Sequence, residues 1–527
     1  MNIAPLLSDQ NTPRLPLAAI IVLAGIYLLT GVAAHDPWKV EDAIHIGIAY
    51  GFAFHGGWLT PAIAGEFWPH TAPLYHWIAA LLGRLLEGLL PFHNAARLAT
   101  TVFGALYLLF LAGTARVFFG EMASRLAPLL AIGTLGLLVP MHEAQPAIAG
   151  LACAALAWWG GALNQQGKPM GAPLLGLGLG LAFLAHGLVG LIMALAVLPA
   201  PILRRDWRGL AVALLIAIPL IALWPLLLLQ QTPEYWNLWW HNEIAEATSA
   251  RSFPVMRHLE QLGWAAWPLW PLALFGLWKR RHSFDRLVLP MIGAVLTLFW
   301  FFSGAPRSLA VITVLIPLTL IAAAGAEHLR RGSANAFDWF SVMTFSFFAA
   351  LIWLGASAQG LGWPPKIASN FTKLAPGHEA SFGFLILAAA IAMTLLWLAT
   401  WGLRRASWRP SLRWAVGLCL LWVLTATLWM PWIDHATTYR PVVLSLKNAL
   451  PSSVDCIERA DIGPAQRASL DYFAGIRTVV RSEHRSCNWR IGIGQKENTV
   501  SSNWTEVWQG ARTSNPKERW YLERRSD

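Results

Sequence analysis

Charged residues are scarce in this sequence. Asp, Glu, Lys and Arg make up 13% of the 527 residues, whereas a soluble protein of ordinary composition has about 25%. This excludes a soluble enzyme as the main body of the chain. The net charge of +11 does not indicate a nucleic-acid partner, because no basic stripe lies in a soluble segment long enough to bind one.

Cysteine is scarce too, and the common catalytic motifs are missing. The four cysteines include no C-x-x-C pair and no His/Cys spacing for structural zinc. The sequence also lacks a Gly-rich phosphate loop, an H-E-x-x-H motif, a nucleophile elbow and inverted repeats. We recognise no soluble domain that would bind a nucleotide sugar.

Long apolar runs are abundant instead. Hydrophobic residues make up 56% of the chain, and stretches near 20 residues recur, each long enough to cross a bilayer core of roughly 30 Å. We therefore predict an all-α polytopic membrane protein with about thirteen transmembrane helices. Gly187, with His186 before it, predicts a tight turn between two of them. The predicted spans are 15–34, 97–119, 124–141, 146–163, 172–186, 187–203, 209–229, 263–278, 286–303, 308–327, 336–356, 383–403 and 413–431.

The positions of the basic clusters predict the orientation. Clusters at 204–208, 279–281, 330–331 and 404–413 fall on one side of the membrane if the thirteen spans hold, and short basic loops stay cytoplasmic. This places the N-terminus in the cytoplasm of a bacterial cell. The loops at 35–96, 230–262 and 357–382 and the tail then lie on the periplasmic side of the inner membrane.

The tail reads as a separate domain. We divide the chain into a transmembrane domain at 1–435, with its outer loop at 35–96, and a small soluble α+β periplasmic domain at 436–527. A helix is predicted at 465–474, and strands at 477–481 and 489–493. Cys456 and Cys487 either form a disulfide or remain two buried thiols.

The first outer loop is the most polar part of the membrane domain. Two amphipathic helices are predicted at 41–54 and 73–90, both lying in the membrane interface, with turns at 56–61 and 65–66 between them. Glu41 and Asp42 begin the first of these helices. Acids and histidines beside a bilayer are costly unless they bind something or take part in chemistry.

The order of these elements resembles the membrane-embedded C-type glycosyltransferases, in the bacterial branch of aminoarabinose transferases and protein O-mannosyltransferase relatives. The resemblance covers nearly the whole chain. It departs from the family pattern in the reversed Glu-Asp pair, in His70-Thr71 in place of Glu-Lys, in His186 in place of a basic residue and in His142-Glu143 beside Pro146. The matching segments are E-D at 41–42, W-L-T-P at 58–61, G-E at 65–66, P-L-Y-H-W at 73–77, A-A-R-L at 95–98, L-A-F-L-A-H-G at 181–187, F-F-S at 301–303 with Arg307, and Y-R-P-V at 439–442.

The resemblance implies transfer of a sugar from a polyprenyl-phosphate donor to an envelope lipid, glycan or protein. A carboxylate must take the acceptor's proton, and a cation must stabilise the departing phosphate. Glu41 is our candidate base and Asp42 its catalytic neighbour, although both also suit a helix N-terminus. Arg307 is the candidate ligand of the donor phosphate, unless it only reaches toward the headgroups.

A divalent metal is a further possibility that the resemblance implies. His70 and Glu66 could bind it, with His142 or Glu143 as additional ligands, and such a set suits zinc or manganese better than magnesium. The alternative for His70 is a hydrogen bond to a loop carbonyl. His186, between two spans, and His241, in an aromatic loop, are weaker candidates, because a core histidine and an interfacial aromatic belt explain them equally well.

Two other functions remain open. A transporter or flippase of lipid-linked glycans would share the membrane domain, but such proteins usually show internal repeats and broken helices near the midplane. A catalytically degenerate family member would bind a lipid without turnover. The absence of a nucleotide-sugar domain and the single polar outer loop favour the glycosyltransferase with a lipid-linked donor.

Overall fold

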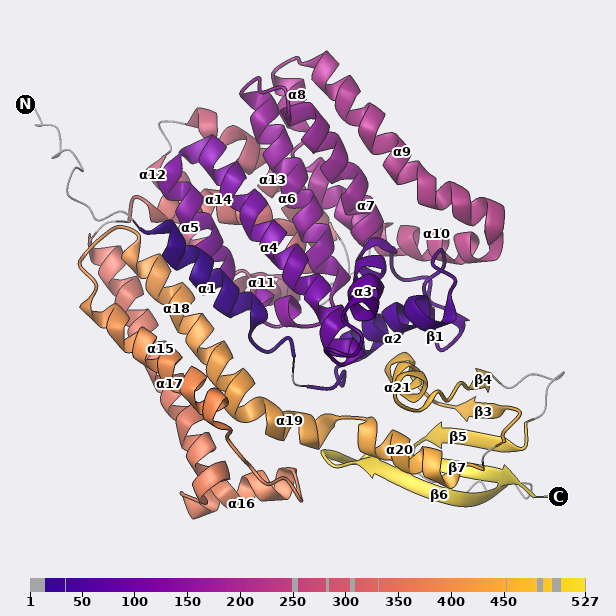
Figure 1. Ribbon diagram of the computed structural model, residues 1–527. Coiled ribbons are helices and arrows are strands. Elements are labelled where there is room, and N and C mark those ends of the chain that lie inside the picture. Colours follow the sequence, from indigo (N-terminus) through magenta and orange to yellow (C-terminus); the bar gives the residue numbers. More distant parts are fainter. Residues whose placement is uncertain are drawn as a thin grey trace, which may run out of the picture.

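The computed structural model describes residues 15–33, 35–248, 255–280, 284–303, 309–329, 331–451, 453–480, 487–494 and 504–526. It is mostly helical, with a two-stranded and a five-stranded sheet in those residues. The helices of the first three-quarters of the chain form one large body, and the five-stranded sheet lies at its edge, on the side of α2 (Val40–His55) (Figure 1).

Each predicted apolar segment overlaps a helix, but not every helix could cross a membrane alone. Within the described ranges, seven helical segments are long and apolar enough to do so, or eight if α5 (Glu121–Ile132) and the segment Leu135–His142, which is bent by 61° from it, count as one span. The count of thirteen is therefore not confirmed. The seven are α4 (Phe92–Phe119), α6 (Pro146–Gln165), α7 with α8 (Gly171–Leu203), α9 (Trp207–Gln231), α15 (Arg331–Leu361), α17 with η5 (Phe384–Gly402) and α18 with η6, α19 and α20 (Arg409–Ala449).

The remaining helices are shorter. Those that overlap predicted spans are α1 (Leu17–Leu29), α5 (Glu121–Ile132), α12 (Leu269–Lys279), α13 (Val288–Ser303) and α14 (Leu315–Ala326). Those that connect them are α10 (Pro233–Thr248), α11 (Val255–Ala265) and α16 (Pro365–Leu374).

The predicted turn within α7 (Gly171–Leu195) is present. His186 and Gly187 leave the helical conformation, and Gly187 adopts φ 57° and ψ −144°, which strains any residue with a Cβ. Both limbs pack along α6. A Cβ at Gly160 would lie 2.2 Å from the backbone nitrogen of Leu175 in the first limb, and one at Gly150 would lie 3.3 Å from Cε of Met193 in the second. The chain therefore reverses at Gly187, and α7 consists of two antiparallel limbs.

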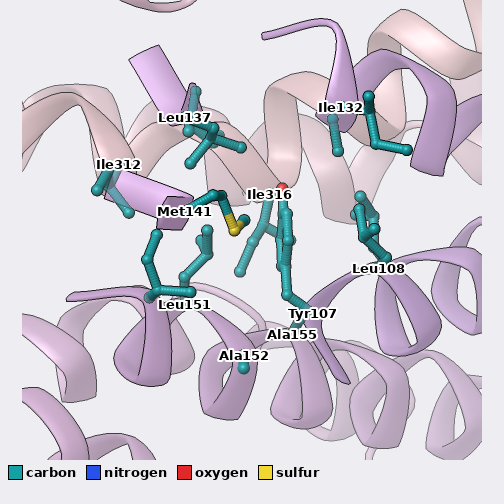
Figure 2. Close-up of a cluster of buried hydrophobic side chains, with 14 of the residues drawn as sticks. Tyr107, Leu108, Ile132, Leu137, Met141, Leu151, Ala152, Ala155, Ile312 and Ile316 are labelled. Carbon is teal, nitrogen blue, oxygen red and sulfur yellow. The ribbon is translucent and has the colours of Figure 1, made fainter. Parts of the chain in front are cut away.

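The core of the membrane domain lies where α4, α5, α6 and α14 meet (Figure 2). Tyr107 of α4, Leu151 and Ala155 of α6 and Ile316 of α14 are at most 1% exposed and point toward one another. Alanine and glycine along α6 let neighbouring backbones approach closely, which is how helices pack where lipid offers no hydrophobic driving force.

The polar loop after α1 folds into two helices and a small hairpin. They are α2 (Val40–His55), β1 (Ala62–Ile63), β2 (Glu66–Phe67) and α3 (Leu74–Leu85), in agreement with the predicted amphipathic helices and turns. Helix α2 lies between α3 and α21 (Pro464–Ala474) (Figure 1). A Cβ at Gly47 would be 2.7 Å from that of Ala468, so α2 and α21 are in close contact.

The C-terminal part has its own hydrophobic core, which contains Val443, Leu446, Trp520 and Leu522. Its sheet has the order β4-β3-β5-β7-β6, with β3 parallel to β4 and β5, and β7 antiparallel to β5 and β6. The predicted helix is α21, and the predicted strand at 489–493 is β5. The predicted strand at 477–481 contains β4, whereas β3, β6 and β7 were not predicted. The strands are β3 (Ile457–Ala460), β4 (Val479–Val480), β5 (Trp489–Ile493), β6 (Trp504–Arg512) and β7 (Asn515–Arg525).

Cys456 and Cys487 form a disulfide with a Cα–Cα distance of 5.4 Å, which decides between the two possibilities left open by the sequence. Cys153 and Cys419 are buried and unpaired with each other.

Candidate active site

A buried ion pair forms the centre of the polar loop. The Arg97 guanidinium donates from Nε to Oδ1 of Asp42 at 3.0 Å and from Nη2 to Oδ2 at 2.6 Å. Asp42 is 1% exposed and Arg97 is not exposed at all. Burial raises the pKa of Asp42, but the Arg97 charge outweighs it and holds that pKa below the ordinary value. Asp42 is therefore a bound carboxylate with no free face for a substrate.

Glu41 has the opposite environment. Its side chain is 58% exposed, and Oε2 lies 3.5 Å from Nε2 of His45, one helical turn further along α2. When Nε2 of His45 carries a proton, its hydrogen bond lowers the pKa of Glu41 and outweighs burial, which raises that pKa. Of the two acids predicted as catalytic, Glu41 is the one that a substrate can reach.

Glu143 joins the same polar centre from the turn before α6. Its carboxylate pairs with the half-exposed ammonium group of Lys39. Burial raises the pKa of Glu143 to about 6, although Lys39 opposes the shift. The backbone around it is anchored, because Thr100 donates to the Glu143 carbonyl oxygen at 2.6 Å and Ala144 N–H donates to Asp42 at 2.8 Å.

A third buried acid, Asp36, connects this centre to the C-terminal part. Asp36 accepts hydrogen bonds from Nε of Arg440 at 2.8 Å and from the Thr438 hydroxyl at 2.7 Å, and its own N–H donates to Asp434 at 2.9 Å. Burial opposes ionisation of Asp36, but these two donors lower its pKa below the ordinary value.

Sequence reasoning missed the partners of these acids. Arg97 and Arg440 both lie inside segments that carried the family resemblance, at 95–98 and 439–442. The presence of a basic residue in each motif was therefore a usable signal, but neither had been given a role. Lys39 had no signal beyond its place between two acids.

Glu66 and His70, the predicted metal ligands, have different surroundings. Two guanidinium groups bind the Glu66 carboxylate: Nη2 of Arg459 lies 2.7 Å from Oε2, and Arg467 forms a second ion pair. These arginines hold the pKa of Glu66 low despite its partial burial. His70 is exposed and packs edge-on against Trp68. In the part of the chain that the structure describes, no group of three or more His, Cys, Asp or Glu side chains is placed to hold a metal. The donor set around Glu66 therefore does not fit a metal ion.

The remaining candidates are scattered. His142 is buried, with its ring nitrogens 2.5 Å from the carbonyl oxygens of Leu138 and Tyr27 and its ring stacked on Trp422. His186 lies at the break in α7, and His241 is exposed on α10. Arg307 lies outside the described residues.

Glu243, which the sequence placed in the same aromatic loop as His241, has a clear structural role. Its Oε2 accepts the Leu188 N–H at 2.9 Å and so caps the second limb of α7. A Cβ at Gly187 would come within 2.4 Å of this carboxylate. The aromatic loop therefore helps to hold the chain reversal.

This arrangement of a helical body, an acid-bearing helix α2 and a small sheet domain packed on it occurs in a solved protein. The chain shares its fold with ArnT from Cupriavidus metallidurans: the structure bound to undecaprenyl phosphate gives a TM-score of 0.72 over 96% of both chains, at 16% identity. The apo structure of the same protein gives 0.68.

Sequence comparison with curated proteins points to the same group of proteins as the fold. The undecaprenyl phosphate-α-4-amino-4-deoxy-L-arabinose arabinosyl transferase of Serratia proteamaculans is 27% identical over 245 residues, which are 43% of this chain and 44% of the relative. The one from Yersinia pestis is 28% identical over 270 residues, 49% of this chain and 43% of the relative. The aligned region thus spans less than half of each curated relative. No family model matches. The resemblance to the aminoarabinose transferase branch is confirmed.

Proposed function

We propose that the protein is a glycosyltransferase that moves a sugar from a polyprenyl-phosphate donor to an envelope lipid, glycan or protein. The observation that carries the proposal is the fold, which the chain shares over 96% of its length with a protein that binds undecaprenyl phosphate. An accessible carboxylate, Glu41, stands beside a rigid charged centre in the loop that carries the family motif.

In this proposal the residues of the site have different roles. Glu41 takes the proton of the acceptor as the acceptor oxygen attacks the sugar carbon and the bond to the lipid phosphate breaks. Asp42, bound by Arg97, positions the start of α2 and does not itself react. Lys39 is a cation beside this centre, and its half-exposed ammonium group can exchange Glu143 for the departing phosphate. Arg307 stays a candidate for the same role.

We place this chemistry on the periplasmic side of the inner membrane. The chain then has thirteen spans, and the two limbs of α7 are separate spans. Its N-terminus is cytoplasmic, and the domain at 436–527 is periplasmic. Support comes from the basic clusters of the sequence. Reversal of the chain at Gly187 also supports it, because that reversal turns one long apolar helix into two.

The predicted metal site at Glu66 and His70 has no part in this mechanism. Because Glu66 is held by Arg459 and Arg467, a divalent cation would have to bind elsewhere. We expect Glu66→Ala to loosen the C-terminal part without changing the metal content of the purified protein, measured by mass spectrometry. A metal that is present in the wild type and lost in this variant would restore the predicted site.

The test is a transfer assay with purified protein in liposomes, a tagged polyprenyl-phosphate sugar and cell-envelope extract. Glu41→Gln should lower kcat by about 100-fold or more, the range for loss of a general base. Glu87→Gln is the matched control, because Glu87 is an exposed acid that follows α3 in the same loop.

Other outcomes would overturn the proposal. Full transfer by both Glu41→Gln and Asp42→Ala would remove these acids from the mechanism. Uptake of the tagged lipid into vesicles without transfer would identify a transporter. Binding with neither transfer nor uptake would identify a lipid-binding relative without activity.

A further inference from the structure

His45 is held between two partners that approach opposite sides of its ring. Its Nδ1 lies 3.1 Å from Nε2 of His76, and its Nε2 lies 3.5 Å from Oε2 of Glu41. The other nitrogen of His76, Nδ1, lies 3.2 Å from the carbonyl oxygen of Ala72. The result is a chain of contacts that runs from an exposed carboxylate to a buried backbone carbonyl.

Only one arrangement of protons satisfies this series of contacts from Glu41 to Ala72. A carbonyl oxygen only accepts, so His76 Nδ1 carries a proton and donates it to Ala72. His76 is completely buried, and this burial holds its pKa well below the ordinary value, so its ring is neutral and its Nε2 is an acceptor. His45 must therefore donate from Nδ1. Its Nε2 is then the position that gains or loses a proton, and this nitrogen faces Glu41.

We propose that His45 is a proton relay behind Glu41, with its tautomer set by His76. This rests on the proposed function. The acceptor O–H bond breaks and the acceptor oxygen forms its bond to the sugar carbon. The electron pair of the broken sugar–oxygen bond leaves with the lipid phosphate. The acceptor proton goes to the Glu41 carboxylate and from there to Nε2 of His45, which becomes an imidazolium until water removes the proton.

The geometry of these three side chains fits a proton relay and does not fit a metal site. Glu41 and His76 contact different nitrogens of His45, so the three side chains do not converge on one point that a cation could occupy. A buried core histidine would satisfy its ring with structural partners alone. His45 instead directs Nε2 at the accessible carboxylate of Glu41.

The relay predicts a particular pH dependence. The titratable groups facing the His45 ring are Glu41 on its own helix and His76 and Tyr75 on α3, while Asp42 is occupied by Arg97. Glu41 can accept a proton for the relay only when Nε2 of His45 is free. The rising limb of kcat against pH then belongs to the Glu41–His45 pair and not to Glu41 alone.

The decisive variant is His45→Asn. The asparagine amide nitrogen takes the place of Nδ1 and keeps the bond to His76, but it cannot accept a proton. We expect kcat to fall at least about 10-fold with KM unchanged, and the rising limb of kcat to move to lower pH. Addition of imidazole to His45→Ala should restore part of the activity. His55→Asn is the control, because His55 ends the same helix and pairs with Asp471 instead.

Two results would overturn the relay. One is wild-type kcat and an unmoved pH limb in His45→Asn while the wild-type protein transfers sugar. The other comes from ¹⁵N spectra of histidine-labelled protein, in which we expect neutral His45 to carry its proton on Nδ1. A proton on Nε2 would refute the relay even if the wild type shows no transfer, so failure of the proposed function and failure of the relay are distinguishable.

Discussion

Removal of Asp42 should destabilise the protein far more than removal of its neighbour Glu41. In Asp42→Ala the Arg97 guanidinium loses both carboxylate oxygens while it remains inaccessible to water. Breaking a buried ion pair from one side costs about 3–5 kcal/mol, because an uncompensated charge is left behind. The Ala144 N–H also loses its acceptor. In Glu41→Ala an exposed carboxylate disappears, and the cost should stay below about 0.5 kcal/mol.

The size of the effect can be measured by thermal unfolding in detergent. With about 2.1 cal/mol/K of unfolding entropy per residue, a chain of 527 residues has roughly 1.1 kcal/mol/K. A loss of about 3–5 kcal/mol therefore lowers Tm by about 3–5 °C. Glu41→Ala should lower it by less than about 0.5 °C.

The double variant Asp42→Ala, Arg97→Met isolates the cause. It removes the buried charge together with its partner, so only the unsatisfied Ala144 N–H remains, at a cost of about 1–3 kcal/mol. Part of the lost Tm should return. If Asp42→Ala unfolds within 1 °C of the wild type, roughly 1 kcal/mol on the same scale, or if the double variant is less stable than the single one, the ion pair is not the buried anchor described above.

Three further outcomes follow from the structure. Because burial raises the pKa of Glu143 from 4.5 to about 6, the folded state binds its proton more tightly than the unfolded chain. That stabilisation is fully present below pH 4.5 and is lost as the pH rises through 6, so the wild type should lose about 2 kcal/mol relative to Glu143→Gln in unfolding experiments from pH 4 to 7. Replacing Cys456 and Cys487 with serine removes a disulfide that closes a loop with a sequence separation of 31, and should lower the stability of the C-terminal part by about 4 kcal/mol. Trypsin should then cleave this part faster. The control Cys153→Ala should show no such change. Gly160→Ala places a methyl group 2.2 Å from the backbone of α7 and should cost about 1–3 kcal/mol of stability. The control Gly25→Ala, which has open space around it, should leave Tm unchanged or higher. Equal Tm values for the two variants would contradict the close packing of α6 and α7.

Local patterns in the sequence predicted much of the fold. Apolar runs located the helices, amphipathic spacing located α2 and α3, and Gly187 located the reversal in α7. Each of these signals lies within a short stretch of chain, because helix periodicity and positive φ are properties of consecutive residues. The strands β6 and β7 were missed because they bury few apolar side chains: β6 alternates between exposed and partly exposed positions, and β7 buries only Trp520 and Leu522.

The candidate site was predicted only in part, for the same reason. The acids were found because they are unusual in an apolar chain, but their partners come from far away. Asp42 and Arg97 are 55 residues apart, and Glu66 and Arg459 are 393 apart. No local pattern joins such pairs, so Glu66 could be read as a metal ligand with His70 until the folded chain placed two arginines on it.

Apolar runs and the order of short motifs were enough to predict a helical membrane protein that resembles the aminoarabinose transferases, with acidic residues near the start of α2. Hydrophobicity and motif order can be read from the sequence directly, because neither depends on contacts between residues that are distant in the chain. Only the tertiary structure decided which acid is free to react. Glu41 and Asp42 are adjacent in the chain, but one faces solvent and His45 while the other is enclosed with Arg97, because successive residues of a helix point about 100° apart. That rotation separates a candidate base from a structural anchor.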